Sequence, residues 1–181
     1  SAGGIGMSNI IVMNNPYQDK EALDTVFYYC FNKCTDFYGF GVRLSSPQEA
    51  INSMKYIKKY WNQTDGKQLC HLVIGVDTNF GTGHEYTKYQ TAKDSAYLDD
   101  FTMQVSYLIY QAGFQNCFFR HISRNGRPHA HYVINSVHIT NGTKLRSHSE
   151  LAYGIYDYLS KKYPDLRWTG VKYNQGLDES E

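Results

Sequence analysis

The sequence predicts an α+β fold in which a central, largely antiparallel sheet carries flanking helices. Up to residue 112, apolar runs of strand length alternate with stretches that repeat apolar side chains at helical spacing. Two further strand-like runs then follow each other across a short turn, which predicts a hairpin rather than a crossover. The 181 residues suffice for one domain with a sizeable core.

The chain begins with a short apolar strand and an amphipathic helix. Residues 9–13 form the strand, and residues 20–32 repeat apolar positions every three to four residues, behind Gln18 or Asp19 as a cap. Residues 37–44, which are rich in aromatic residues and contain two glycines, are expected to form a strand or an extended loop.

Start signals mark the second helix. Ser46 suits the N-cap, Pro47 the first helical position and Glu49 the third. Residues 69–77 are the most strand-like run of the first half, and residues 79–86 are expected to form a loop.

A long helix is predicted from Thr91 or Ala92 to about residue 112, where Gly113 is a suitable stop. The remaining elements are two strands at residues 114–122 and 129–139, and a last helix from its N-cap Ser147 to residue 163.

The domain is expected to span residues 7–169. Residues 1–6 resemble a cloning remnant, and residues 170–181 read as a polar tail that begins a truncated C-terminal region. No apolar run approaches a membrane span, and four cysteines without a secretion signal are expected to be reduced, which favours the cytoplasm.

Residues 120–135 contain the candidate metal-binding histidines. His129 and His131 are two apart, so a strand directs both imidazoles to one face. His121 ends the preceding strand, and antiparallel pairing across the turn would bring it beside them. Three neutral imidazoles suit a divalent transition metal and leave positions open for a substrate. A chance His-x-His pair on a strand remains the alternative interpretation.

Arginines surround these histidines. Arg120, Arg124 and Arg127 lie close together, and no acidic residue occurs from residue 120 to residue 135. Guanidinium groups beside a metal suit a phosphate better than a cationic substrate. With Lys144 and Arg146 they form a local basic cluster, although the net charge is only +1.

The pattern His-x7-His-x-His, followed by Tyr132-Val133-Ile134-Asn135, resembles the metal-binding motif of conjugative relaxases. These mobilisation nucleases belong to the HUH endonuclease superfamily, and the MobP-type branch is the most similar. The resemblance covers residues 10–163 approximately. It implies an HUH-relaxase-like sheet with the metal histidines on adjacent central strands, and Mg²⁺ or Mn²⁺ as the cofactor, with Zn²⁺ as a further candidate.

The resemblance also implies a function. Relaxases nick one strand at the origin of transfer of a plasmid or integrative element, form a 5′-phosphotyrosine adduct and later religate the strand. The implied partners are single-stranded DNA, accessory relaxosome proteins and a coupling protein, in the bacterial cytoplasm and without a membrane. The basic cluster would then bind DNA.

The family's nucleophile is a tyrosine on an early helix. Matching the apolar positions of residues 23–32 selects Tyr29, with Tyr28 as the alternative and Tyr17 as a weaker third candidate. Tyr28 and Tyr29 differ by about 100° around a helix axis, so they cannot face the same partner.

Some residues around the expected metal ligands follow the family's pattern less closely. His71 and Asn135 are expected to lie behind the metal ligands. Ser123 stands where the family often has an acidic residue, and Asp77 or Glu85 could substitute for it.

Three other functions compete with this interpretation. A replication initiator or transposase of the same superfamily would use a tyrosine downstream of the histidines, such as Tyr153, Tyr156 or Tyr158. A DNA-binding module that has lost catalysis and a metallohydrolase that activates water are the others.

Overall fold

Six strands form one sheet in the order β2-β4-β5-β3-β1-β6. The computed structural model describes residues 8–78 and 86–174, so nearly all of the loop expected at residues 79–86 lies outside the described residues. Neighbouring strands pair antiparallel except β1 and β6, which are parallel. The central, largely antiparallel sheet predicted from the sequence is therefore confirmed. The strands are β1 (Asn9–Met13), β2 (Asp36–Phe40), β3 (Leu69–Gly75), β4 (Asn116–Ile122), β5 (Pro128–Asn135) and β6 (Val171–Asn174).

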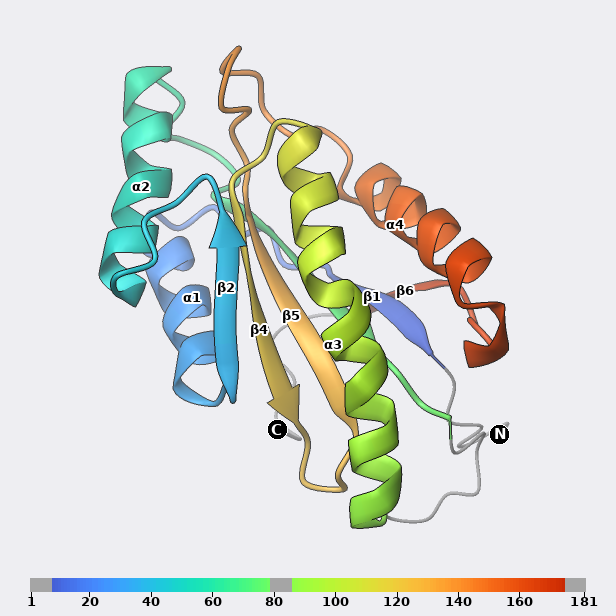
Figure 1. The fold of residues 1–181 in the computed structure, drawn as a ribbon. Coiled ribbons are helices and arrows are strands. Elements are labelled where there is room, and N and C mark those ends of the chain that lie inside the picture. The colour runs from blue at the N-terminus through green and yellow to red at the C-terminus, as the bar shows by residue number, and fades with distance from the viewer. Residues whose placement is uncertain (1–7, 79–85, 175–181) are drawn as a thin grey trace.

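Helices cover both faces of this sheet (Figure 1). Alternation along the strands divides the core in two. Phe118 and Tyr132 join the core beneath α3 and α4, whereas Phe119 and Val133 join the core beneath α1 and α2. None of the described helices has both the length and the apolar character needed to cross a bilayer. The helices are α1 (Ala22–Asn32), α2 (Pro47–Tyr60), α3 (Lys88–Gln111) and α4 (His148–Lys162), and a 3₁₀ turn, η1, spans Pro164–Leu166.

Two of the predicted helix starts are confirmed. The Ser46 hydroxyl accepts a hydrogen bond from the Glu49 backbone N–H at 3.1 Å, with Pro47 at the first turn. The Ser147 hydroxyl caps α4 in the same way.

Two other boundaries differ from the prediction. α3 begins at Lys88 behind the N-cap Thr87, earlier than expected. This first turn was not predicted because its exposed residues show no apolar periodicity. Val171–Asn174, expected in a polar tail, form β6 by adding backbone hydrogen bonds to the edge of β1. Residues 175–181 lie outside the described residues.

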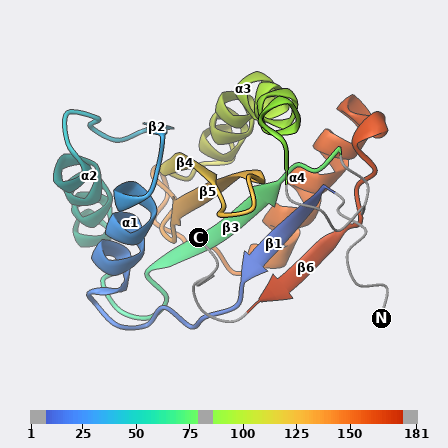
Figure 2. The same cartoon turned by 90° about the horizontal axis from the view of Figure 1, so that it is seen from below.

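The α1/α2 face of the sheet carries four histidines. His71, His121, His129 and His131 share the strand positions that point to this face, together with Val133. Figure 2 shows α1 and α2 gathered over the β2-β4-β5 side of the sheet. His121 and His71 contact Cys30 of α1, and the ring of Tyr29, also in α1, lies beside His131.

Candidate metal centre and nucleophile

The β4–β5 hairpin brings the three motif histidines together. Gly126, at φ 89°, closes the turn, and the register sets His121 directly opposite His129. His131 follows two residues later on the same face. All three are buried, and one potential ligand atom from each lies within 4.8 Å of the others. This is the convergence that the spacing predicted, and the group could hold a metal ion.

One ring nitrogen of each histidine is held by a defined partner. His121 Nε2 lies 2.7 Å from the Cys30 carbonyl oxygen, and His129 Nδ1 lies 3.2 Å from the Arg127 carbonyl oxygen. A carbonyl only accepts, so in the neutral imidazoles these nitrogens carry the proton. The lone pairs are then on His121 Nδ1 and His129 Nε2, which are the candidate ligand atoms.

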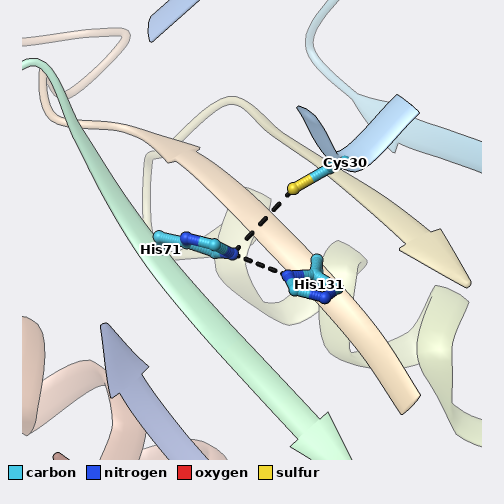
Figure 3. A group of neighbouring side chains, drawn as sticks. All are labelled: Cys30, His71 and His131. Atoms are coloured by element: carbon cyan, nitrogen blue, oxygen red, sulfur yellow. Dashed lines mark hydrogen bonds between the residues drawn. The ribbon is translucent and has the colours of Figure 1, made fainter. Parts of the chain in front are cut away.

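The third histidine is held by another histidine. His131 Nδ1 lies 2.7 Å from His71 Nε2, and both side chains are fully buried (Figure 3). If His131 ligates a metal through Nε2, its Nδ1–H donates to His71 Nε2. His71 then carries its proton on Nδ1, which lies 3.2 Å from the Tyr17 hydroxyl. A metal at this site would thus select one tautomer along His131, His71 and Tyr17.

Tyr29 and Tyr28 point in different directions. The Tyr29 ring lies 6.3 Å from the His131 ring between centroids, half-buried at the edge of α1. The Tyr28 hydroxyl instead donates to Gln48 Oε1 of α2 at 3.0 Å. Lys33, one turn after Tyr29, places its ammonium 5.0 Å from the Tyr29 ring centroid. Of the two adjacent tyrosines, Tyr29 is the one beside the histidines.

Tyr17, the weaker candidate, has a different environment. Its side chain is buried and its hydroxyl contacts His71. Burial raises the pKa of its phenol well above the ordinary value for tyrosine. Its backbone adopts φ 47°, which turns the chain back toward β3, where its carbonyl accepts from the Gln68 N–H. These contacts suit a residue that positions His71.

Two of the five basic residues lie next to the histidines. Arg124 and Arg127 line a cavity of about 420 Å³ together with His129 and Asn9. The Arg127 guanidinium lies across Gly75, where any Cβ would come within 2.6 Å of Nη2. Glycine at that position therefore leaves room for a positive charge on the metal face of the sheet.

Arg120 lies elsewhere. It pairs with Ala130 in the sheet, so its side chain points to the α3/α4 face, opposite to that of its neighbour His121. There it forms ion pairs with Asp36 and Asp99. The expectation that it joins the metal face is not met, because adjacent strand residues point in opposite directions.

The remaining three predicted positions lie at the far end of β5. Asn135 is six residues from His129, about 20 Å along a strand, and donates to the Met54 carbonyl and Gln115 Oε1. Lys144 bridges to Val137 beyond that end and donates to the Lys67 carbonyl. Arg146, next to this bridge in the chain, is exposed. Asn135 therefore anchors α2 to the sheet, and neither basic residue is near the metal centre.

One hydrogen-bond partner of His121 was not apparent from the sequence. Asp77 is buried, and its N–H is bonded to Ser8 Oγ beyond the end of β3, whereas Glu85 lies outside the described residues. The Cys30 carbonyl holds His121 Nε2, and the substitute role of Asp77 or Glu85 stays a prediction. A backbone carbonyl carries no residue-type signal, so the sequence offered no way to find it.

Comparison with known proteins agrees with this geometry. Residues 29–163, most of the chain, match the family described as "Relaxase: MobA/VirD2-like, nuclease domain". No curated protein and no solved structure matches. The match includes all three motif histidines and Tyr29. This chain belongs to the relaxase family of DNA nucleases.

Proposed function

We propose that the protein nicks one DNA strand at an origin of transfer through Tyr29, with a divalent metal held by His121, His129 and His131. The observation that carries the proposal is the position of the Tyr29 ring, 6.3 Å from the His131 ring, at the edge of the three-histidine group. Tyr29, the three histidines and the two arginines that line the cavity beside His129 lie close together, and this proximity supports the proposed roles.

The donor set fits such a cofactor. Three neutral imidazoles, each held through its second nitrogen, match the usual arrangement of histidine ligands in metal sites. A divalent ion bound there would polarise the phosphoryl oxygens and neutralise charge in the transition state. Mg²⁺ and Mn²⁺ are the ions we propose in use, although imidazoles favour Mn²⁺ or Zn²⁺ over Mg²⁺.

The chemical step uses the phenol of Tyr29. Its oxygen forms a bond to the scissile phosphorus as the bond from phosphorus to the 3′ oxygen breaks. The phenol gives up its proton and the 3′ oxygen takes one up, so the products are a 5′-phosphotyrosine and a free 3′-hydroxyl. The reverse reaction religates the strand without another energy source.

Single-stranded DNA is the proposed substrate. Arg124 and Arg127 line the cavity beside His129, and Lys33 lies beside Tyr29. These charges would hold phosphates on either side of the scissile bond. Arg120, on the opposite face, and Lys144 and Arg146, beyond the far end of β5, are left out of this path.

The competing tyrosines are less favourably located. Tyr156 and Tyr158 of α4 pack against the α3/α4 core, on the face of the sheet opposite to the histidines, and Tyr153 of the same helix is exposed. A replication initiator or transposase mechanism would need one of them beside the metal. The geometry therefore favours the relaxase mechanism.

The test compares Tyr29→Phe with Tyr28→Phe on single-stranded DNA from candidate transfer origins. Tyr29→Phe should abolish cleavage and the covalent adduct, while Mn²⁺ and DNA affinity persist, because only one oxygen is removed. Tyr28→Phe loses a bond to Gln48 and should still form the adduct. An adduct in Tyr29→Phe would refute the assignment, and DNA binding without any adduct in the unmodified protein would favour a module that has lost catalysis.

A further inference from the structure

Cys30 brings a thiol to the buried side of the metal centre. Its Sγ lies 3.9 Å from His71 Nε2, which in turn lies 2.7 Å from His131 Nδ1 (Figure 3). One potential ligand atom from each of these three side chains lies within 4.8 Å of the others, and all three are fully buried. This group is separate from the three-histidine group, except that both contain His131.

We propose that Cys30, His71 and His131 form a second metal site, specific for thiophilic cations of the Zn²⁺ class, that competes with the three-histidine site for His131. A thiolate and two imidazoles favour soft or borderline cations over Mg²⁺ and Mn²⁺. The binding part of this proposal is independent of DNA cleavage. Its consequence for activity rests on the function proposed above.

The distances indicate what binding would change. Bonds of about 2.3 Å to sulfur and about 2.0 Å to nitrogen separate a tetrahedral S···N pair by about 3.5 Å and an N···N pair by about 3.3 Å. The Cys30–His71 separation of 3.9 Å is already close to the first value. The His71–His131 separation of 2.7 Å is too short for the second. Binding must therefore break the hydrogen bond that orients His131.

Competition follows from the chemistry of the imidazole ring. Neutral His131 has a single nitrogen with a lone pair. A cation bound through Nδ1 requires the proton on Nε2, and this removes His131 from the three-histidine site. Occupancy of the thiolate site should therefore weaken metal binding at the catalytic site, as a built-in response to excess thiophilic metal.

The experiment uses the metal-free protein and two probe ions. Cd²⁺ binding is followed by the ultraviolet charge-transfer absorption of a thiolate–cadmium bond, and Mn²⁺ binding by electron paramagnetic resonance. Cys30→Ser should abolish the cadmium absorption. Cys117→Ser is the matched control, since Cys117 is a buried thiol of the same α1/α2 core, and it should retain the absorption.

A second pair of measurements separates the two sites. His129→Ala should abolish Mn²⁺ binding and keep the cadmium absorption. Cys30→Ser should raise the Cd²⁺ concentration that displaces half of the Mn²⁺ by about tenfold or more, because the thiolate ligand is lost. If Cys30→Ser does not fold, as judged by thermal unfolding, Cys30→Ala replaces it.

Three results would overturn the proposal: cadmium absorption that survives loss of Cys30, absorption that disappears in His129→Ala, or equal displacement of Mn²⁺ in the unmodified and Cys30→Ser proteins. Absence of Mn²⁺ binding in the unmodified protein, with a cadmium absorption that depends on Cys30, would instead contradict the proposed function and support the thiolate site.

Discussion

Replacing His71 with phenylalanine tests whether the metal centre depends on the chain from His131 through His71 to Tyr17. Phenylalanine keeps a ring in this fully buried position and removes both nitrogens. The substitution removes the hydrogen bonds of 2.7 Å to His131 Nδ1 and 3.2 Å to the Tyr17 hydroxyl, together with the weaker 3.9 Å contact to Cys30 Sγ. The backbone and the packing of β3 should change little.

The magnitude follows from the two groups left without these partners. A buried polar group deprived of its hydrogen bond costs about 1–3 kcal/mol, so the free energy of unfolding should fall by about 2–4 kcal/mol once the apolar gain of phenylalanine is included. Loss of the group that orients a ligating histidine weakens metal affinity by about 10–100-fold, or about 1.4–2.8 kcal/mol.

Guanidinium chloride unfolding of the metal-free protein and calorimetric titration with Mn²⁺ measure the two effects separately. Tyr17→Phe is the control, because it removes only the distal hydrogen bond and leaves His71 against His131. It should cost about 1 kcal/mol of stability and change Mn²⁺ affinity less than His71→Phe does. Unchanged Mn²⁺ affinity in His71→Phe would refute the orienting role of His71.

Two further predictions concern charge. Arg127→Gln should weaken single-stranded DNA binding and reduce the slope of its salt dependence by about 1. Arg120→Gln is the control, because it loses ion pairs on the opposite face and should leave the slope unchanged. A slope that changes only in Arg120→Gln would mean that the DNA binds elsewhere. His148 is buried, and within the described part of the chain neither ring nitrogen has a hydrogen-bond partner. Burial, aided by the nearby Lys67, lowers its pKa to about 4. The unfolded chain binds this proton near pH 6.5 and the folded protein does not, so up to about 3 kcal/mol of stability should be lost as the pH falls from 6.5 to 4. His148→Leu should flatten that dependence in urea unfolding, and an equal slope in both proteins would contradict the assignment.

Local rules account for much that the sequence predicted correctly. Strand alternation puts His129 and His131 on one face, and a short turn through Gly126 returns the chain so that His121 meets them. The caps at Ser46 and Ser147 depend only on the first turn of each helix. These features involve residues close together in the sequence, where backbone geometry leaves few alternatives.

The same rules, applied strictly, would have corrected one expectation. Arg120 precedes His121 on a strand, so the two side chains cannot share a face. The three arginines are close together in the sequence and were expected to form one surface. In the fold, Arg120 lies on the other face of the sheet from Arg124 and Arg127. Only the fold could supply its partners, Asp36 and Asp99, from other elements.

The contacts that orient the histidines of the candidate metal centre were decided by tertiary structure. The Cys30 carbonyl meets His121 across 91 positions of the chain, and His71 meets His131 across 60. The first contact uses a backbone atom that every residue has, so it cannot be predicted from the residue type. The second depends on β3 pairing with β5, which periodicity along either strand does not specify. The sequence alone therefore brings the three candidate ligand histidines together, and the packing of α1 and β3 against β5 determines which nitrogen each one would offer to a metal.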